Sequence, residues 1–132
     1  MTETSIAPWL SVSNGADAAS FYTSALGATE AYRLEGDGGE VLVAQLLVDG
    51  APIWVSEDPA STTKGNGERL VRMIVTVNDP DAAFRRAIDA GATAVAPVAD
   101  AYGWRTGRVS DPFGFDWEFS RRLDDGAAPE AT

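Results

Sequence analysis

Two stretches of equal length decide the fold: NGADAASFYTSALGAT at residues 14–29 and NDPDAAFRRAIDAGAT at residues 78–93. A gapless alignment that matches Asn14 with Asn78 makes them identical at seven of sixteen positions. Each opens with a residue type that caps helices, carries apolar side chains at three- and four-residue spacing, and ends at a glycine. They therefore predict two amphipathic helices, one between Asn14 and Gly27 and one between Asn78 and Gly91.

Strand-like runs surround both predicted helices, and Asp49-Gly50 marks a hairpin between two of them. The runs are Ile6–Val12, Ala28–Leu34, Glu40–Val48, Pro52–Ser56, Leu70–Val77, Thr93–Val98, Arg105–Ser110 and Phe115–Ser120. With the helices they predict an α+β protein of two tandem βαβββ units, at about residues 6–57 and 70–121. Residues 58–69 are expected to form a polar linker, and residues 124–132 a disordered tail.

One helix and four strands are too few to bury a sheet, so the two units are expected to pair. We predict a single domain over residues 1–132, with one curved, half-barrel mixed sheet and both helices outside. A concave face would remain inside, and a cleft at the junction of two similar halves is a natural ligand site.

Composition excludes several kinds of chemistry. The chain has 132 residues, 10 basic and 20 acidic side chains, a formal charge of −10, no histidine and no cysteine. Disulfides, thiolate or imidazole catalysis and Cys/His metal sites are therefore absent. The negative charge disfavours binding to nucleic acid and to anionic membranes. No basic, apolar leader or long apolar run is present, so a soluble, cytoplasmic protein is expected.

Two motifs point to a known superfamily. Val12-Ser13-Asn14 leads to Phe21-Tyr22 and then to Ala25-Leu26-Gly27-Ala28. Tyr102-Gly103-Trp104-Arg105-Thr106-Gly107-Arg108 is followed by Asp111-Pro112-Phe113-Gly114. The pattern over residues 6–121 resembles the vicinal oxygen chelate superfamily, in its glyoxalase/bleomycin-resistance protein/dioxygenase branch.

The resemblance implies where an ion would bind in metal-dependent members. Four inward residues, usually His, Gln or Glu, hold it there, and their positions here carry Ala7, Trp54, Arg72 and Glu118. Arg72 follows from strand alternation, whereas the gapless alignment of the two halves gives Val71. Only Glu118 could act as a ligand, so we expect no metal and no cofactor.

Strand alternation predicts which side chains share the cleft face with these positions. The expected ligand-binding residues on the strands are Trp9, Ser11, Trp54, Ser56, Arg72, Asp116 and Glu118. Tyr102, Trp104 and Arg105 are expected to close one end of the cleft. The opposite faces should form the core, from Pro8, Leu10, Val12, Val71, Met73, Val75, Val77, Phe115, Trp117 and Phe119.

Structural roles remain open for the same residues. Arg72 and Glu118 could form an ion pair that fills the vacated ion position. Trp9 and Trp54 could pack in a closed cleft or at a dimer contact, and Tyr102 and Trp104 could simply stack in their hairpin.

Our leading hypothesis is a metal-free binding protein that sequesters an aromatic or cationic small molecule. The resemblance to resistance proteins implies a homodimer. One alternative is a lyase, isomerase or hydrolase of the same fold that uses Glu118 or Asp116 with Arg72. Others are a metal-dependent glyoxalase or dioxygenase relative and a regulatory or structural dimer with a filled cleft.

Overall fold

Both helices begin at a capping side chain and end at a glycine. In the computed structural model, which describes residues 5–60 and 71–123, α1 spans Gly15–Leu26 and α2 spans Pro80–Ala90. The Asn14 side chain accepts a hydrogen bond from the Asp17 amide at 2.9 Å, and the Asp79 carboxylate accepts one from the Ala82 amide at 3.1 Å. These bonds satisfy amides of the first turn that have no partner inside the helix.

The strands lie within three residues of their predicted positions at either end. They are β1 Trp9–Val12, β2 Thr29–Glu35, β3 Val41–Val48, β4 Ala51–Glu57, β5 Arg72–Thr76, β6 Thr93–Ala101, β7 Trp104–Ser110 and β8 Asp116–Arg122. Asp49 and Gly50 join β3 to β4 with φ values of 52° and 90°, the conformation of a two-residue hairpin turn. The predicted tail and most of the predicted linker lie outside the described residues.

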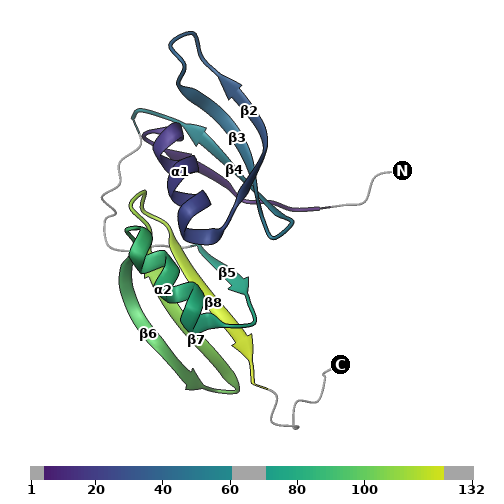
Figure 1. Ribbon diagram of the computed structural model, residues 1–132, viewed down its shortest axis with the longest axis vertical. Helices are drawn as coiled ribbons and strands as arrows, with labels where there is room; N and C mark the ends of the chain where they lie inside the picture. Colours follow the sequence, from purple (N-terminus) through teal and green to yellow (C-terminus); the bar gives the residue numbers. More distant parts are fainter. Residues whose placement is uncertain (1–4, 61–70, 124–132) are drawn as a thin grey trace. The chain divides into compact units, whose positions relative to one another are not determined.

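The chain forms two compact units, residues 1–65 (unit 1) and residues 66–132 (unit 2). Each unit contains one four-stranded mixed sheet, in the order β1-β4-β3-β2 or β5-β8-β7-β6. The first strand of each unit is parallel to its last strand, and the other pairs are antiparallel. This confirms the predicted α+β class and the duplicated βαβββ unit (Figure 1). The half-barrel, the cleft and the single domain involve both units together and remain predictions.

Each helix packs against one face of its own sheet: α1 contacts β3 and β4, and α2 contacts β6, β7 and β8. In unit 1 the fully buried side chains of this layer include Tyr22 from α1 and Leu46 and Val55 from the strands. In unit 2, Trp117 and Phe119 of β8 are buried, as the alternation predicts. The face opposite the helix is called the helix-free face below.

Part of the predicted core is less buried than expected. Val71 keeps 70% of its surface exposed, because β5 begins only at Arg72 and Val71 precedes its ladder. Phe115, in the turn before β8, is only partly buried, and so are Pro8, Met73, Val75 and Val77. The first strand is also shorter than predicted and begins at Trp9, although the Pro8 carbonyl still accepts a hydrogen bond from the Trp54 amide at 2.9 Å.

The Asp111-Pro112-Phe113-Gly114 motif has a structural role in unit 2. Asp111 is buried, and its carboxylate accepts hydrogen bonds from the Phe113 and Phe115 amides at 2.8 and 2.9 Å. Its other oxygen accepts one from the Trp117 indole Nε1 at 2.8 Å. One side chain thus closes the turn and fixes a large core residue.

The pairing of the first strand with the last strand in each unit shows which residues of the two units are equivalent. Leu10 pairs with Val55 in unit 1, and Val75 pairs with Phe119 in unit 2. The gapless alignment of the two halves matches Val55 with Phe119, but it matches Leu10 with Ile74 instead of Val75. The strand β5 is therefore displaced by one position from that alignment. Ala7 corresponds to Arg72, as strand alternation predicts, and not to Val71.

Candidate functional site

The helix-free face of unit 1 carries a row of aromatic side chains. The register aligns Trp9 with Trp54, Trp54 with Gln45, and Gln45 with Tyr32 across four strands. The Trp9 and Trp54 rings stack with centroids 6.0 Å apart and planes at 26°. Tyr32 meets Trp54 edge-on at 6.1 Å and 64°. We call Trp9, Trp54 and Tyr32 the aromatic row.

The aromatic row retains substantial accessible surface. Trp9 is 57% exposed and Tyr32 is 47% exposed, while Trp54 between them is partly buried. Ser11 and Ser56 are paired on the same face, one step further along β1 and β4. The predicted residues of unit 1 therefore lie together, on a surface that offers indole and phenol rings beside hydroxyl groups.

The helix-free face of unit 2 carries charges instead. Arg72 Nε lies 3.4 Å from Glu118 Oε1, so the predicted ion pair forms, between side chains that are 44% and 20% exposed. Asp116 is the ladder partner of Arg72 and is nearly buried. The three predicted polar residues thus lie together on β5 and β8.

The remaining two predicted ligand-binding residues, Tyr102 and Trp104, lie at the start of β7. Tyr102 is fully exposed at the β6–β7 hairpin, with a positive φ of 55°. Trp104 is the ladder partner of Arg122, whose guanidinium carbon lies 5.7 Å from the centre of the Trp104 rings. This geometry is typical of a cation–π contact. Trp104 therefore has an intramolecular partner within its own hairpin.

Sequence reasoning missed three residues of these faces: Tyr32, Gln45 and Arg108. Arg108 is the ladder partner of Glu118, and Gln45 is the ladder partner of Trp54. The signal for both was the antiparallel pairing of the last two strands of each unit, which places facing residues on the same side. Tyr32 had no such signal, because a bulge between Glu30 and Tyr32 interrupts the alternation.

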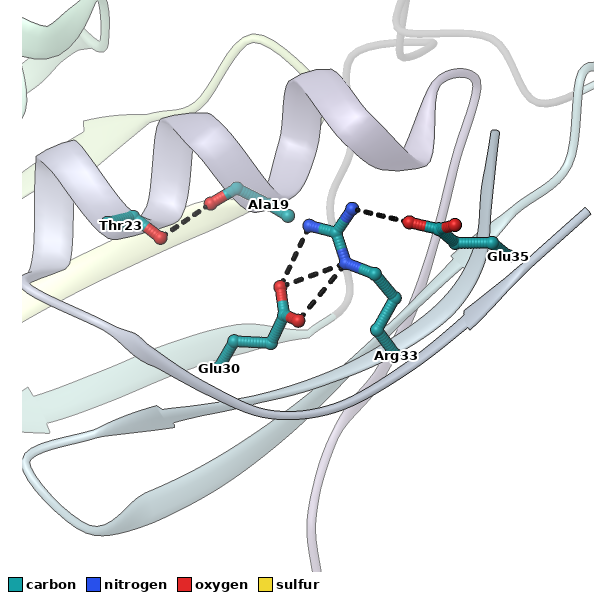
Figure 2. A network of polar contacts seen from close by, with 5 residues as sticks. All are labelled: Ala19, Thr23, Glu30, Arg33 and Glu35. Carbon is teal, nitrogen blue, oxygen red and sulfur yellow. Dashed lines mark hydrogen bonds and ion pairs between the residues drawn. The ribbon is translucent and has the colours of Figure 1, made fainter. Parts of the chain in front are cut away.

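Two other arginines have close carboxylate partners and contrast with those of the helix-free face. Figure 2 shows Arg33 between Glu30 and Glu35, at 2.8 and 3.3 Å. Arg33 pairs with the buried Ala44, so it lies on the helix side of β2. Its hydrogen bonds to Glu30 and then to Glu35 raise the pKa of the Arg33 guanidinium above its ordinary value.

Arg105 joins β7 to the first turn of α2, so it lies on the helix side of the sheet and does not share the face of Glu118, contrary to the prediction. Its Nε and Nη2 atoms donate to the two Asp81 carboxylate oxygens at 2.7 and 2.8 Å, and Nη1 donates to Asp100 at 2.8 Å. The hydrogen bond to Asp81, and then that to Asp100, raises the pKa of Arg105. The same contact lowers the pKa of Asp81.

The residues at the four positions that the family resemblance implies for an ion do not have the chemistry to hold a divalent cation. Of Ala7, Trp54, Arg72 and Glu118, only Glu118 offers a ligand atom, and the Arg72 guanidinium already neutralises it. Within residues 5–60 and 71–123, no three His, Cys, Asp or Glu side chains are grouped so that they could hold a metal ion.

The family model described as the Glyoxalase/Bleomycin resistance protein/Dioxygenase superfamily matches residues 5–119. The chain belongs to this family. An uncharacterized protein of Mycobacterium bovis, Mb0911c, is 35% identical over 127 residues, which cover 90% of this chain and 84% of the relative.

Two solved structures are similar to this fold. TioX from Micromonospora sp. ML1 has a TM-score of 0.72 at 28% identity, with 91% of this chain and 100% of that chain covered. The At5g48480 gene product of Arabidopsis thaliana has a TM-score of 0.70 at 31% identity, with 90% and 99% covered. In the described part of this family member, neither helix is long and apolar enough to cross a membrane.

Proposed function

We propose that this family member is a metal-free binding protein that sequesters an aromatic or cationic small molecule. The observation that carries the proposal is the aromatic row, Trp9, Trp54 and Tyr32, on a sheet face that its own helix leaves uncovered. The proposal includes a homodimeric, cytoplasmic protein.

The aromatic row has the properties of a stacking surface. Indole faces offer a large apolar area and a negative ring face, so they attract flat aromatic groups and cations alike. Trp54 is held between Trp9 on one side and Tyr32 on the other, which limits its rotation. A ligand that stacks on it would therefore lose little side-chain entropy on binding.

The donor chemistry of the ion position supports the metal-free part of the proposal. Three of the four side chains cannot ligate an ion, and a positive guanidinium beside the fourth opposes cation binding. Metal analysis of protein purified without chelators should find no stoichiometric divalent ion. One bound ion per chain would contradict this part.

Binding is tested by titration with bleomycin and with proflavine, a planar cation, followed by tryptophan fluorescence and calorimetry. We expect saturable binding to the wild type and about a tenfold loss in Trp54→Ala, because one stacked ring contributes roughly 1–2 kcal/mol. Trp54→Phe should retain most of the affinity. Val95→Ala, an exposed apolar truncation on β6, is the control and should bind like the wild type.

Two results would contradict the proposal. One is a folded wild type that binds neither compound. The other is a Trp54→Ala variant with unchanged affinity. Urea unfolding of each variant confirms that a loss of binding does not come from a loss of folding.

The Arg72–Glu118 pair favours an enzyme of the same fold as the second candidate. A largely buried carboxylate beside a guanidinium can transfer a proton while the arginine orients a carbonyl or carboxylate. Mass spectrometry of a bound compound after incubation distinguishes the two functions. Conversion by the wild type, with none in a Glu118→Gln variant that still binds, would establish catalysis.

A further inference from the structure

Three of the ten basic residues of this acidic chain gather on the helix-free face of unit 2. Arg72 lies on β5, Arg108 on β7 and Arg122 on β8, in ladders that place them on the side of Glu118. Asp116 and Glu118 are the acidic residues that β8 contributes to this face. Three arginines against two carboxylates leave one positive charge, on a protein whose net charge is −10.

Of these three arginines, Arg108 has the fewest contacts that balance its positive charge. It is partly buried and lies opposite Glu118, yet it makes no ion pair with any residue of 5–60 or 71–123. A guanidinium carries five N–H donors, and partial removal from water without an acceptor is unfavourable. The position therefore favours an added anion.

Arg72 is also loosely held. Its distance of 3.4 Å to Glu118 is longer than the 2.7–2.8 Å contacts that Arg105 makes with Asp81 and Asp100. It is longer, too, than the roughly 2.7–2.9 Å of a charge-assisted hydrogen bond. Glu118 on β8 lies between β5, which carries Arg72, and β7, which carries Arg108, so one carboxylate stands between two guanidinium groups.

We infer that the helix-free face of unit 2 binds the carboxylate of a small organic acid between Arg72 and Arg108. The carboxylate follows from the two arginines of this unit alone, whatever group the rest of the acid carries. A planar carboxylate can accept paired hydrogen bonds from a guanidinium fork, and Arg108 supplies a fork that no internal carboxylate occupies within the described residues. Glu118 holds Arg72 in the unliganded protein and competes with the incoming anion.

Calorimetric titration with 2-naphthoate and its neutral isostere 2-naphthamide tests this inference. We expect naphthoate to bind at least about tenfold more tightly at low salt, and this advantage should shrink as the ionic strength rises. Arg108→Gln should reduce naphthoate affinity to that of naphthamide. Arg85→Gln makes the same charge change on the exposed surface of α2 and should leave the preference intact.

Glu118→Gln provides a change in the opposite direction. Removal of the competing carboxylate should tighten naphthoate binding several-fold and leave naphthamide binding unchanged. A simple structural role for Glu118 would predict weaker binding of both compounds.

The outcomes separate this inference from the proposed function. Binding of naphthamide and naphthoate with equal affinity would overturn the carboxylate site and leave aromatic binding standing. Equal losses in Arg108→Gln and Arg85→Gln would show that only overall charge matters, and would also overturn it. Binding of neither compound would contradict both.

Discussion

The two units place different chemistry on the same backbone. One row across the sheet reads Trp9, Trp54, Gln45 and Tyr32 in unit 1 and Ile74, Glu118, Arg108 and Ala96 in unit 2. Strand order is shared, yet Trp54, the central ring of unit 1, corresponds to Glu118 of the ion pair in unit 2, and Gln45 corresponds to Arg108. The helix-free faces diverge freely because neither is needed to bury its helix.

The helix-facing sides of the two sheets differ in where the large buried side chains lie, on the helix in unit 1 and on the strands in unit 2. In unit 1 the buried ring is Tyr22 on the helix, whereas unit 2 buries Trp117 and Phe119 on a strand. Beneath α2 the strand carries Gly107, where unit 1 has Ala44. Each core is filled, but the bulk comes from opposite layers.

The largest expected effect tests this exchange directly. Phe119→Ala should lower the free energy of unfolding by about 3–5 kcal/mol, because it removes a fully buried ring and leaves a cavity. Val55→Ala, at the corresponding position of unit 1, removes only two methyl groups and should cost roughly 2 kcal/mol. Urea unfolding followed by circular dichroism measures both. Equal losses would show that the two layers are filled alike.

A smaller effect is expected at Gly107. A Cβ atom there would lie 2.6 Å from Val98 Cγ2 and 2.9 Å from Phe84 Cδ2, closer than packed atoms allow. Gly107→Ala should therefore destabilise the protein by about 1–3 kcal/mol. Phe84→Leu in the same chain should recover part of this loss. A double-mutant cycle that finds no coupling would argue against Phe84 as the close neighbour.

The smallest effect concerns the first turn of each helix and depends on pH. Asp17 and Asp81 are the acidic side chains of the first turns of α1 and α2, but only Asp81 has an ion-pair partner within the described residues, Arg105. The folded state lowers the pKa of Asp81, so this contact stabilises the protein above the unfolded aspartate pKa of about 4 and is lost as the pH falls further.

Asp81→Asn should therefore destabilise the protein at pH 7, and its difference from the wild type should shrink toward pH 3. Asp17→Asn is the matched control. Chemical denaturation at a series of pH values measures both variants. A pH-independent difference for Asp81→Asn would show that Arg105 does not stabilise the ionised carboxylate.

The elements were predictable because their signals are local. The capping residues Asn14 and Asp79 and the terminating glycines fix the helices, and alternating apolar residues mark the strands. The α+β class, the duplication and the helix-facing positions of Leu10, Val12, Trp117 and Phe119 followed from these patterns. The predicted burial of Val71 was wrong, because no local sequence pattern shows at which residue a strand begins to pair with its neighbour.

The neighbours of the predicted site residues were harder to predict, because they come from pairings between strands. Tyr32 on β2 and Trp54 on β4 are distant in the sequence, and the whole of β3 separates them. The bulge after Glu30 also turns Glu30 and Tyr32 to opposite faces, against the usual alternation. Arg108 faces Glu118 only through the β7–β8 ladder. The alternation of side chains within one strand predicts neither the Tyr32–Trp54 contact nor the Arg108–Glu118 pairing.

The one-position offset between the two units has a consequence for how such duplicated chains can change in length. The helices end at equivalent glycines, Gly27 and Gly91, yet α1 has 12 residues and α2 has 11. A residue lost from a helix shortens it by about 1.5 Å and rotates its remaining face by roughly 100°. A residue lost from a paired strand instead turns every following side chain to the other face. The difference in length between the two units therefore falls in the helix, where it leaves the paired strands in register. A gapless alignment of the two halves ignores this difference, so along β5 it matches helix-facing residues of one unit with residues on the helix-free face of the other.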